Sequence, residues 1–170
     1  MGIISKEKNI GTMEVMCTLP IKDFELVIGK YLSILSLLLV GLLLTSIMFF
    51  NLVAVGTNID YGAVFTGYLG LFLAGSVYAS MGIFASSLTD NQVVGFIIAI
   101  FFVLIFFLID KLLIFMPNLI AGTIQYLSID YHLSNISRGV IDTRNLIYFG
   151  SFIGFFLFTT VRVLEMRKWK

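Results

Sequence analysis

Four long stretches of the chain contain no Asp, Glu, Lys or Arg, and the charged residues gather between them. The stretches run from Tyr31 to Ile59, Tyr61 to Thr89, Asn91 to Ile109 and Asn145 to Val161. A helix needs about 20 mostly apolar residues to cross a bilayer, and a charge at its centre costs roughly 2.5–3.5 kcal/mol on the insertion scale. Apolar and polar residues do not alternate here, so we predict helices rather than barrel strands. The spans are placed near 31–53, 62–86, 92–109 and 146–164.

The composition agrees with a lipid environment and excludes several classes of protein. Hydrophobic residues fill 59% of the 170 positions and charged residues only 12%, whereas a soluble domain carries about 25% charged residues. The 11 basic and 10 acidic residues nearly balance, which argues against binding to nucleic acid. A single cysteine, Cys17, excludes an internal disulfide. A single histidine, His132, supplies too few ligands for a typical zinc site.

The sequence carries no motif for catalysis or nucleotide binding. HExxH, nucleophile-elbow and P-loop patterns do not occur, and the predicted spans hold no charged residue near their middle that would suggest a proton relay. We therefore expect neither enzyme activity nor a cofactor or metal site. If the protein moves a substrate, a partner has to supply the energy.

Lysine and arginine predict the orientation. They gather at the two ends of the chain, as Lys6, Lys8, Lys22, Lys30, Arg162, Arg167, Lys168 and Lys170. The connection around Asn58–Asp60 has none, and the connection from Asp110 to Arg144 has three, offset by three Asp. The positive-inside rule then places both termini in the cytoplasm of a multi-pass protein of the plasma (inner) membrane. A signal peptide is not expected, because a charged thirty-residue stretch precedes the first apolar run.

These patterns predict an all-α membrane protein with about four transmembrane helices. An N-terminal cytoplasmic helical segment covers residues 1–30, and the transmembrane domain covers 31–165. Before the last span, an outer loop (110–145) is expected to form re-entrant or interfacial helices. Residues 166–170 form a cytoplasmic tail.

The first thirty residues predict two helices interrupted at Pro20. The first is imperfectly amphipathic and carries Ile10, Met13, Val15, Met16 and Leu19. The residue before a proline disfavours helical geometry, whereas Pro20 and Asp23 suit the first turn of a second helix, which runs into the first span. Such a segment either contacts a partner or lies flat on lipid, and these residues favour neither.

The loop from Met116 to Thr143 contains two sets of apolar residues at helical spacing. They are Leu119, Ile120, Thr123, Ile124, Leu127 and Tyr131, followed by Leu133, Ile136 and Val140. Two short helices on the outer side are therefore expected. They either line an exit route or close the outer end of the bundle.

Small residues recur on one face of two predicted spans. The second span has Gly75, Ala79, Gly82 and Ser86, and the last span has Gly150 and Gly154. Small side chains allow helix backbones to approach closely in a membrane. We expect close helix packing at these positions, within the chain or across a dimer.

Three stretches, in chain order, resemble parts of the type-2 ATP-binding-cassette (ABC) permeases. Glu7-Lys8, Gly11-Thr12-x-Glu14 and residues 18–30 resemble the cytoplasmic loop that holds the coupling helix, which docks into a groove of the ATPase subunit. Residues 85–92 (ASSLTDNQ) resemble the turn between the fourth and fifth spans. Residues 137–144 and 162–167 are similar to the C-terminal end of the branch linked to gliding motility and nitrous-oxide-reductase maturation.

The resemblance implies a permease subunit of an ABC exporter, itself without a cofactor, because ATP and Mg²⁺ would bind to a separate ATPase subunit. A second permease copy or a related permease would complete the membrane part. The implied ATPase-docking residues are Gly11, Thr12, Glu14, Met16, Thr18, Pro20, Ile21, Asp23, Phe24, Glu25, Gly29 and Lys30.

Members of that family usually have six spans, two of them before the coupling loop. The resemblance therefore leaves three arrangements open: a fragment, a further polypeptide that supplies two spans, or a four-span subunit. A non-transporting membrane scaffold that recruits a cytoplasmic partner is the alternative function. Nucleotide-dependent substrate flux in reconstituted vesicles distinguishes the two functions.

Overall fold

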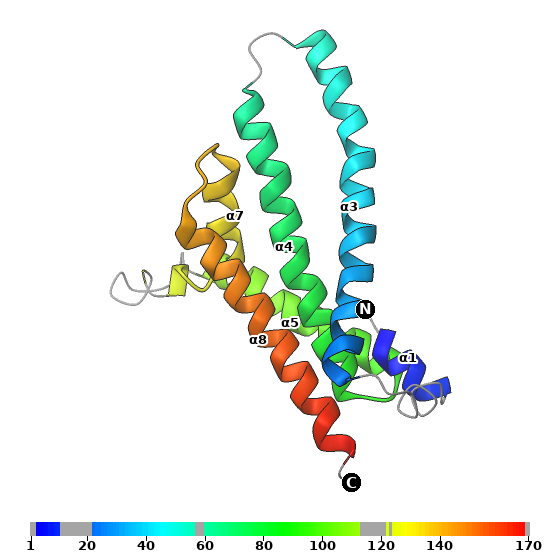
Figure 1. Cartoon of the computed structure of the whole chain (residues 1–170). Helices are drawn as coiled ribbons and strands as arrows, with labels where there is room; N and C mark the ends of the chain where they lie inside the picture. The colour runs from blue at the N-terminus through cyan, green and yellow to red at the C-terminus, as the bar shows by residue number, and fades with distance from the viewer. Residues whose placement is uncertain (1–2, 11–21, 57–59, 113–121, 123, 169–170) are drawn as a thin grey trace.

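The computed structural model describes residues 3–10, 22–56, 60–112, 122 and 124–168. Its helices, labelled in Figure 1, are α1 (Ile3–Ile10), α3 (Asp23–Val55), α4 (Tyr61–Leu88), α5 (Gln92–Leu112), α7 (Ile129–Ser137) and α8 (Thr143–Lys168). No strand occurs in these ranges. The prediction of an all-α protein is confirmed.

Among the described residues, four helices are long and apolar enough to cross a membrane. They are α3, α4, the stretch Gln92–Ile109 of α5 and the stretch Thr143–Met166 of α8, which confirms the predicted number of spans. α3 begins at Asp23, before the apolar run, because polar contacts at Lys22 start the helix early. This agrees with the helix that the sequence analysis expected to carry Asp23 in its first turn and to run into the first span.

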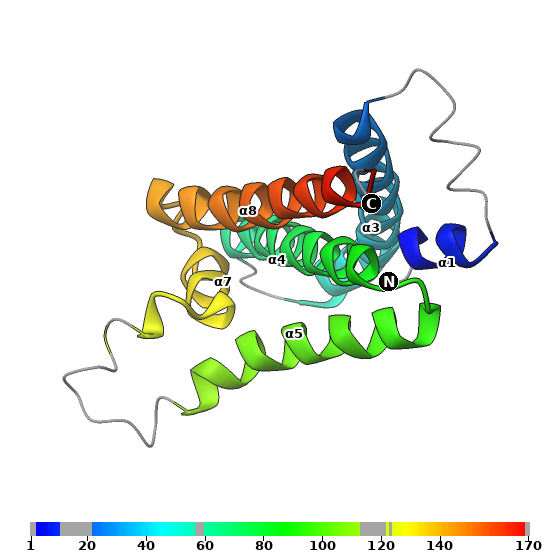
Figure 2. The same cartoon turned by 90° about the horizontal axis from the view of Figure 1, so that it is seen from below.

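α4 lies at the centre of the bundle and contacts each of the five other described helices. Figure 2 shows α5 and α8 on opposite sides of α4. Within the most apolar 18-residue stretch of α4, 56% of the residues are buried inside the structure, whereas none of the corresponding stretch of α3 is buried (0%). Leaving lipid gives apolar side chains no advantage, so close backbone approach and van der Waals packing favour this arrangement. The small residues of α4 permit that approach.

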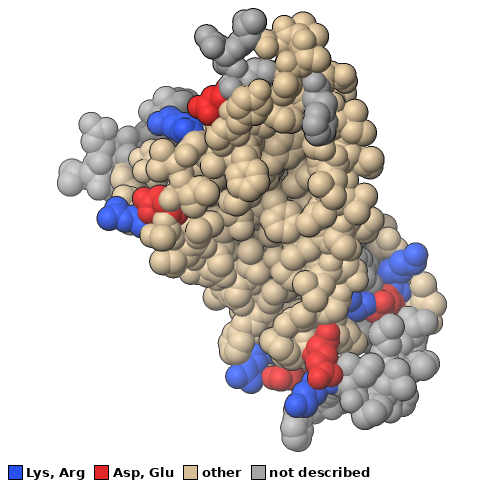
Figure 3. Space-filling model, turned by 45° about the horizontal axis from the view of Figure 1, so that its top comes forward, with Lys and Arg blue, Asp and Glu red and all other residues tan. Residues whose placement is uncertain are grey.

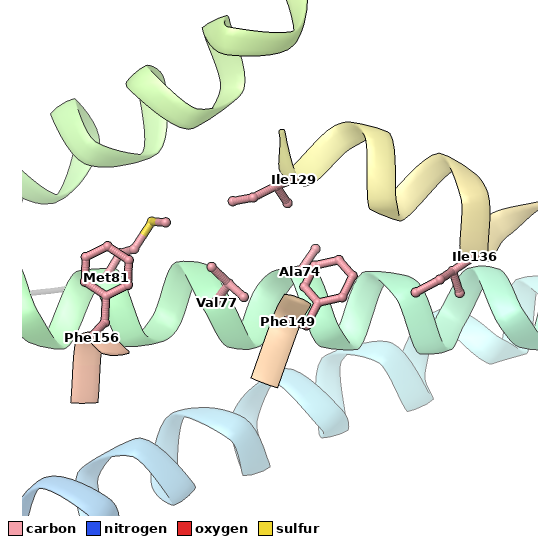
Figure 4. Packing of buried hydrophobic residues seen from close by; sticks show 7 residues of the cluster. All are labelled: Ala74, Val77, Met81, Ile129, Ile136, Phe149 and Phe156. Carbon is pink, nitrogen blue, oxygen red and sulfur yellow. The ribbon is translucent and has the colours of Figure 1, made fainter. Parts of the chain in front are cut away.

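The main core joins α4, α7 and α8. It consists of Ala74, Val77 and Met81 of α4, Ile129 and Ile136 of α7, and Phe149 and Phe156 of α8 (Figure 4). Gly70 of α4 faces α7 so closely that a Cβ atom there would lie 2.9 Å from Leu133 Cδ1. α7 is therefore packed into the bundle as part of its core.

Charged side chains gather at two ends of the molecule and leave a surface without charged residues between them (Figure 3). Lys6, Lys30 and Arg162 belong to the end where α1 lies, whereas Lys111 and Arg138 belong to the end where α7 lies. Large apolar side chains such as Leu37, Met48 and Phe101 are exposed along the surface between the ends. This distribution suits a protein whose middle contacts lipid.

Two short helices are expected before the last span, and one of them, α7, is described over its full length. It combines Tyr131 of the first apolar set with Leu133 and Ile136 of the second. Before it, the described residues 122, 124 and 125 are helical too. α7 starts where it does because Ser128 caps it, its side chain accepting a hydrogen bond from Tyr131 N at 3.3 Å. Gly139, with a φ of +91°, provides the turn that follows α7. Residues 113–121 and 123 lie outside the described residues.

Candidate partner-binding surface

The end of the bundle that holds α1 collects the ends of all four spans. Ile4 of α1 is fully buried in a cluster with Val27 and Tyr31 of α3, Ile83 of α4 and Leu164 of α8. Because this cluster combines side chains of α1 with those of three spans, it fixes the position of α1 relative to α3, α4 and α8. α1 is thus anchored to the membrane-spanning helices.

Two buried serines bring α1 to the end of α4. The backbone N–H of Ser5 donates to Ser86 Oγ at 2.8 Å, and Ser86 Oγ donates to Ser5 Oγ at 3.2 Å. Both residues are fully buried. α5 closes over the same point, because a Cβ atom on Gly95 would lie 3.2 Å from Ser5 Oγ.

An ion pair links α1 to α3. Lys30 Nζ donates to Glu7 Oε2, and the two side chains are only 12% and 23% exposed. Partial burial strengthens such a pair, since bulk water screens it less. Lys30, expected to dock the ATPase, is therefore occupied by a contact within the chain.

The first turn of α3 presents an acidic and aromatic surface. Glu25 accepts a hydrogen bond from Lys22 N through Oε2 at 3.2 Å, and Glu25 N donates to Lys22 O at 2.9 Å. This reciprocal pairing caps the helix. Beside it, Asp23 is partly exposed and the side chain of Phe24 is 58% exposed.

The expected docking residues fall into two groups. Asp23, Phe24 and Glu25 share the first turn of α3, and Gly29 and Lys30 follow on the same helix, Gly29 being exposed. The others lie outside the described residues: Gly11, Thr12, Glu14, Met16, Thr18, Pro20 and Ile21. The first helix predicted for this segment lies outside them too, apart from Ile10 at the end of α1.

The small residues expected in helix packing have different surroundings. A Cβ atom on Gly75 would lie 2.8 Å from Leu38 Cδ2 of α3. Ala79 packs against the cluster around Ile4, and both Gly82 and Ser86 are buried. Around Gly150 and Gly154, by contrast, the described residues place no heavy atom within 4 Å of such a Cβ atom.

Comparison with known proteins identifies the chain's family. A family model described as ABC-2 family transporter protein matches residues 1–151, most of the chain. The chain belongs to the ABC-2 transporter family. No curated protein and no solved structure matches it.

Membership of the ABC-2 transporter family confirms the type of protein that the resemblance implied. The ABC-2 chain is a multi-pass membrane component of transport, and the permease domain is not itself catalytic. The family works with an ATP-binding cassette in general. The match includes α1 and the α4–α5 turn, so the end of the bundle around Ser5 and Ser86 belongs to the family's domain.

The ABC-2 chain also has a buried polar network that the sequence analysis did not predict. His132 of α7 is 4% exposed; its Nδ1 lies 2.7 Å from Asn145 Oδ1 of α8, and its Nε2 lies 3.0 Å from Tyr126 O. Its ring stacks on Tyr148 with centroids 3.9 Å apart. Tyr148 in turn donates its hydroxyl to Leu127 O at 2.7 Å. The network fastens α7 to the beginning of α8, and the only sequence signal for it was a histidine in an apolar chain.

Proposed function

We propose that the chain is the permease subunit of an ABC exporter and couples ATP hydrolysis by a separate ATPase subunit to translocation of a substrate. The observation that carries this proposal is the convergence of α1, the first turn of α3, the α4–α5 turn and the end of α8. A partner that grips this end of the bundle acts on all four spans. ATP and Mg²⁺ bind to the partner, and the chain has no cofactor of its own.

In this proposal, nucleotide binding drives a shift between inward-facing and outward-facing arrangements of the spans. The ATPase holds residues 11–30, and its closure tilts the attached helices. A ligand shifts such an equilibrium only by its different affinity for the two states, so the ATPase has to bind one arrangement more tightly. The exposed Phe24 side chain and the acidic Asp23 and Glu25 offer apolar and charged contacts for that purpose.

The proposed assembly is a dimer of permeases, formed with a second copy or a related permease, together with two ATPase subunits. The proposed assembly also has a place for a further polypeptide that supplies two more spans. Residues 137–144 and 162–167 are similar to the C-terminal end of the branch linked to gliding motility and nitrous-oxide-reductase maturation. This similarity supports assignment of the chain to that branch.

The proposed location is the inner membrane, with both termini in the cytoplasm. Lys6, Lys22 and Lys30 support this orientation, because lysine and arginine are enriched on the cytoplasmic side. The sole cysteine, Cys17, should then resist a membrane-impermeant maleimide in intact cells and react after permeabilisation. An Arg138→Cys variant in a Cys17→Ser background is the control, since Arg138 is exposed at the opposite end and should react from outside. Labelling of Cys17 in intact cells would overturn the orientation.

Two variants at Glu25 test ATPase docking. Glu25→Lys reverses the charge and also removes the cap at Lys22 N, whereas Glu25→Gln keeps a side-chain oxygen for the cap and removes only the charge. If the carboxylate pairs with the ATPase, both variants should lower the amount of ATPase that co-purifies from detergent, by about tenfold for Glu25→Gln. Membrane insertion of both variants should remain normal.

The stability of the two variants separates docking from capping. Glu25→Gln should unfold under the same conditions as the wild-type chain. If Glu25→Gln retains as much ATPase as the wild-type chain and only Glu25→Lys loses it, Glu25 merely caps α3. A scaffold would bind the ATPase equally well, but nucleotide would not then move the spans.

A further inference from the structure

We infer that α1 gives the ATPase-docking segment a second attachment to the spans, through the turn between α4 and α5. The inference rests on the proposed function and deepens it. Residues 11–21 join the end of α1 to Lys22, directly before α3. A pull on this segment therefore acts at two points: on α3 through Lys22, and on the α4–α5 turn through α1. Ser5 and Ser86 are the positioning residues of the second path.

The contact between Ser5 and Ser86 fixes the first turn of α1 to α4 inside the bundle. The N–H of Ser5 finds Ser86 Oγ in the last turn of α4 at 2.8 Å, in a fully buried site. Loss of a hydrogen bond in such a buried site is costly. The start of α1 is consequently fixed to α4 at a defined point.

Gly95 extends this attachment to α5. A Cβ atom at this position would lie 3.2 Å from Ser5 Oγ and 3.2 Å from Thr89 Cγ2, closer than side chains comfortably pack. The first turn of α5 thus lies close to α1, and a side chain at Gly95 would have to push Ser5 and Thr89 aside. α1 contacts both helices that the α4–α5 turn joins, so the turn cannot move away from α1 without breaking these contacts.

The remaining contacts of α1 make it a connector between spans. Glu7 pairs with Lys30 of α3, and Ile4 packs against Val27 of α3 and Ile83 of α4 in one cluster. A helix that merely rested on the lipid surface would bury apolar side chains alone. α1 instead buries a hydroxyl pair and carries a half-buried ion pair, each directed at a particular span.

Amide hydrogen exchange of the full chain in detergent tests the attachment. Ser86→Ala removes the acceptor for Ser5 N–H, and exchange of the α1 amides should become at least about tenfold faster. Ser80→Ala is the matched control: Ser80 is also fully buried on α4, but its hydroxyl donates to Val77 O of its own helix at 2.7 Å. Equal exchange of α1 in both variants would overturn the attachment.

Transmission is tested in the complex with the ATPase. An environment-sensitive fluorophore is placed on Gln92→Cys, at the α4–α5 turn, or on Ser33→Cys of α3, each in a Cys17→Ser background. Both positions are exposed. Addition of ATP and vanadate should change both signals. Ser86→Ala should reduce the Gln92 response at least about fivefold and leave the Ser33 response within about twofold.

The outcomes distinguish the two proposals. A Gln92 response that survives Ser86→Ala overturns the second attachment and leaves the proposed function intact. No nucleotide response at either position in the wild-type complex overturns the proposed function, and the inference with it. If Ser86→Ala does not fold, Gly95→Ala serves as the second variant, because its added methyl group crowds Ser5 Oγ and Thr89 Cγ2 while both hydroxyls remain. It should also reduce the Gln92 response, and an unchanged Gln92 response would overturn the second attachment.

Discussion

Replacement of His132 by alanine should release α7 from α8 and lower the free energy of unfolding by about 3 kcal/mol or more. The ring places one nitrogen 2.7 Å from Asn145 Oδ1 and the other 3.0 Å from Tyr126 O. Each buried polar group that loses its partner costs about 1–3 kcal/mol, and the lost stacking on Tyr148 leaves a cavity as well. Denaturation by sodium dodecyl sulfate, followed by circular dichroism, measures the change.

Two controls locate this effect in the network. Ser134→Ala on the exposed face of α7 removes a hydroxyl that donates only to Tyr131 O of the same helix, so its effect should stay within about 0.5 kcal/mol. The double variant of His132→Ala and Asn145→Ala should cost less than the sum of the two single variants, because both remove the same contact. A loss no larger than that of Ser134→Ala would show that the network does not hold α7.

The spans could be predicted because the positions of charged residues along the sequence are enough to find them. A charge inside the bilayer is costly, so the absence of charge over a membrane-sized stretch indicates a span. Hydropathy does not locate the ends of helices, and the start of the helix near Asp23 was expected from Pro20 and Asp23 instead. α3 extends back to Asp23, since Glu25 and Lys22 cap it outside the apolar run. Such a cap depends on two local polar residues and leaves hydropathy unchanged.

α1 could not be predicted, because its partners lie far away in the sequence. Its eight residues include Lys6, Glu7 and Lys8 and show only a short apolar stripe. What holds the helix in place is Ser86, 81 residues away from Ser5. The sequence analysis noticed Ser86 as a small residue on a helix face and as part of the 85–92 turn, whereas its hydroxyl group has a specific partner. The sequence pattern indicates that Ser86 is small, but it does not indicate the hydrogen bond with Ser5.

His132 was missed for a related reason. One histidine cannot form a metal site by itself, and that argument says nothing about a histidine that satisfies buried oxygen atoms. Its partners, Asn145 and the Tyr126 carbonyl, come from α8 and from the segment before α7. Neither partner has a recognisable spacing from His132. Only the three-dimensional packing of α7 against α8 brings them together.

The Gly75→Ile variant should lower the free energy of unfolding by about 1–3 kcal/mol, whereas Gly154→Ile should leave it unchanged. A Cβ atom at Gly75 would lie 2.8 Å from Leu38 Cδ2 and 3.0 Å from Leu38 Cδ1, so the larger isoleucine side chain would have to push Leu38 of α3 out of its place in the packing. Gly154 lies mid-helix in α8, and the described residues leave the space around its Cβ position open. Both changes replace a poor helix former by a better one, so the difference between them isolates the contact.

The same two variants test whether Gly150 and Gly154 of α8 face lipid or a second copy of the chain. Unfolding in detergent reports on contacts within the chain, and light scattering coupled to gel filtration reports on the mass of the assembly. If α8 only faces lipid, Gly154→Ile should change neither quantity, because lipid chains yield to an added side chain. If a second copy packs against Gly150 and Gly154, Gly154→Ile should dissociate the dimer and leave the unfolding of the single chain unchanged. Equal destabilisation by Gly75→Ile and Gly154→Ile would contradict the close approach of α3 and α4 at Leu38.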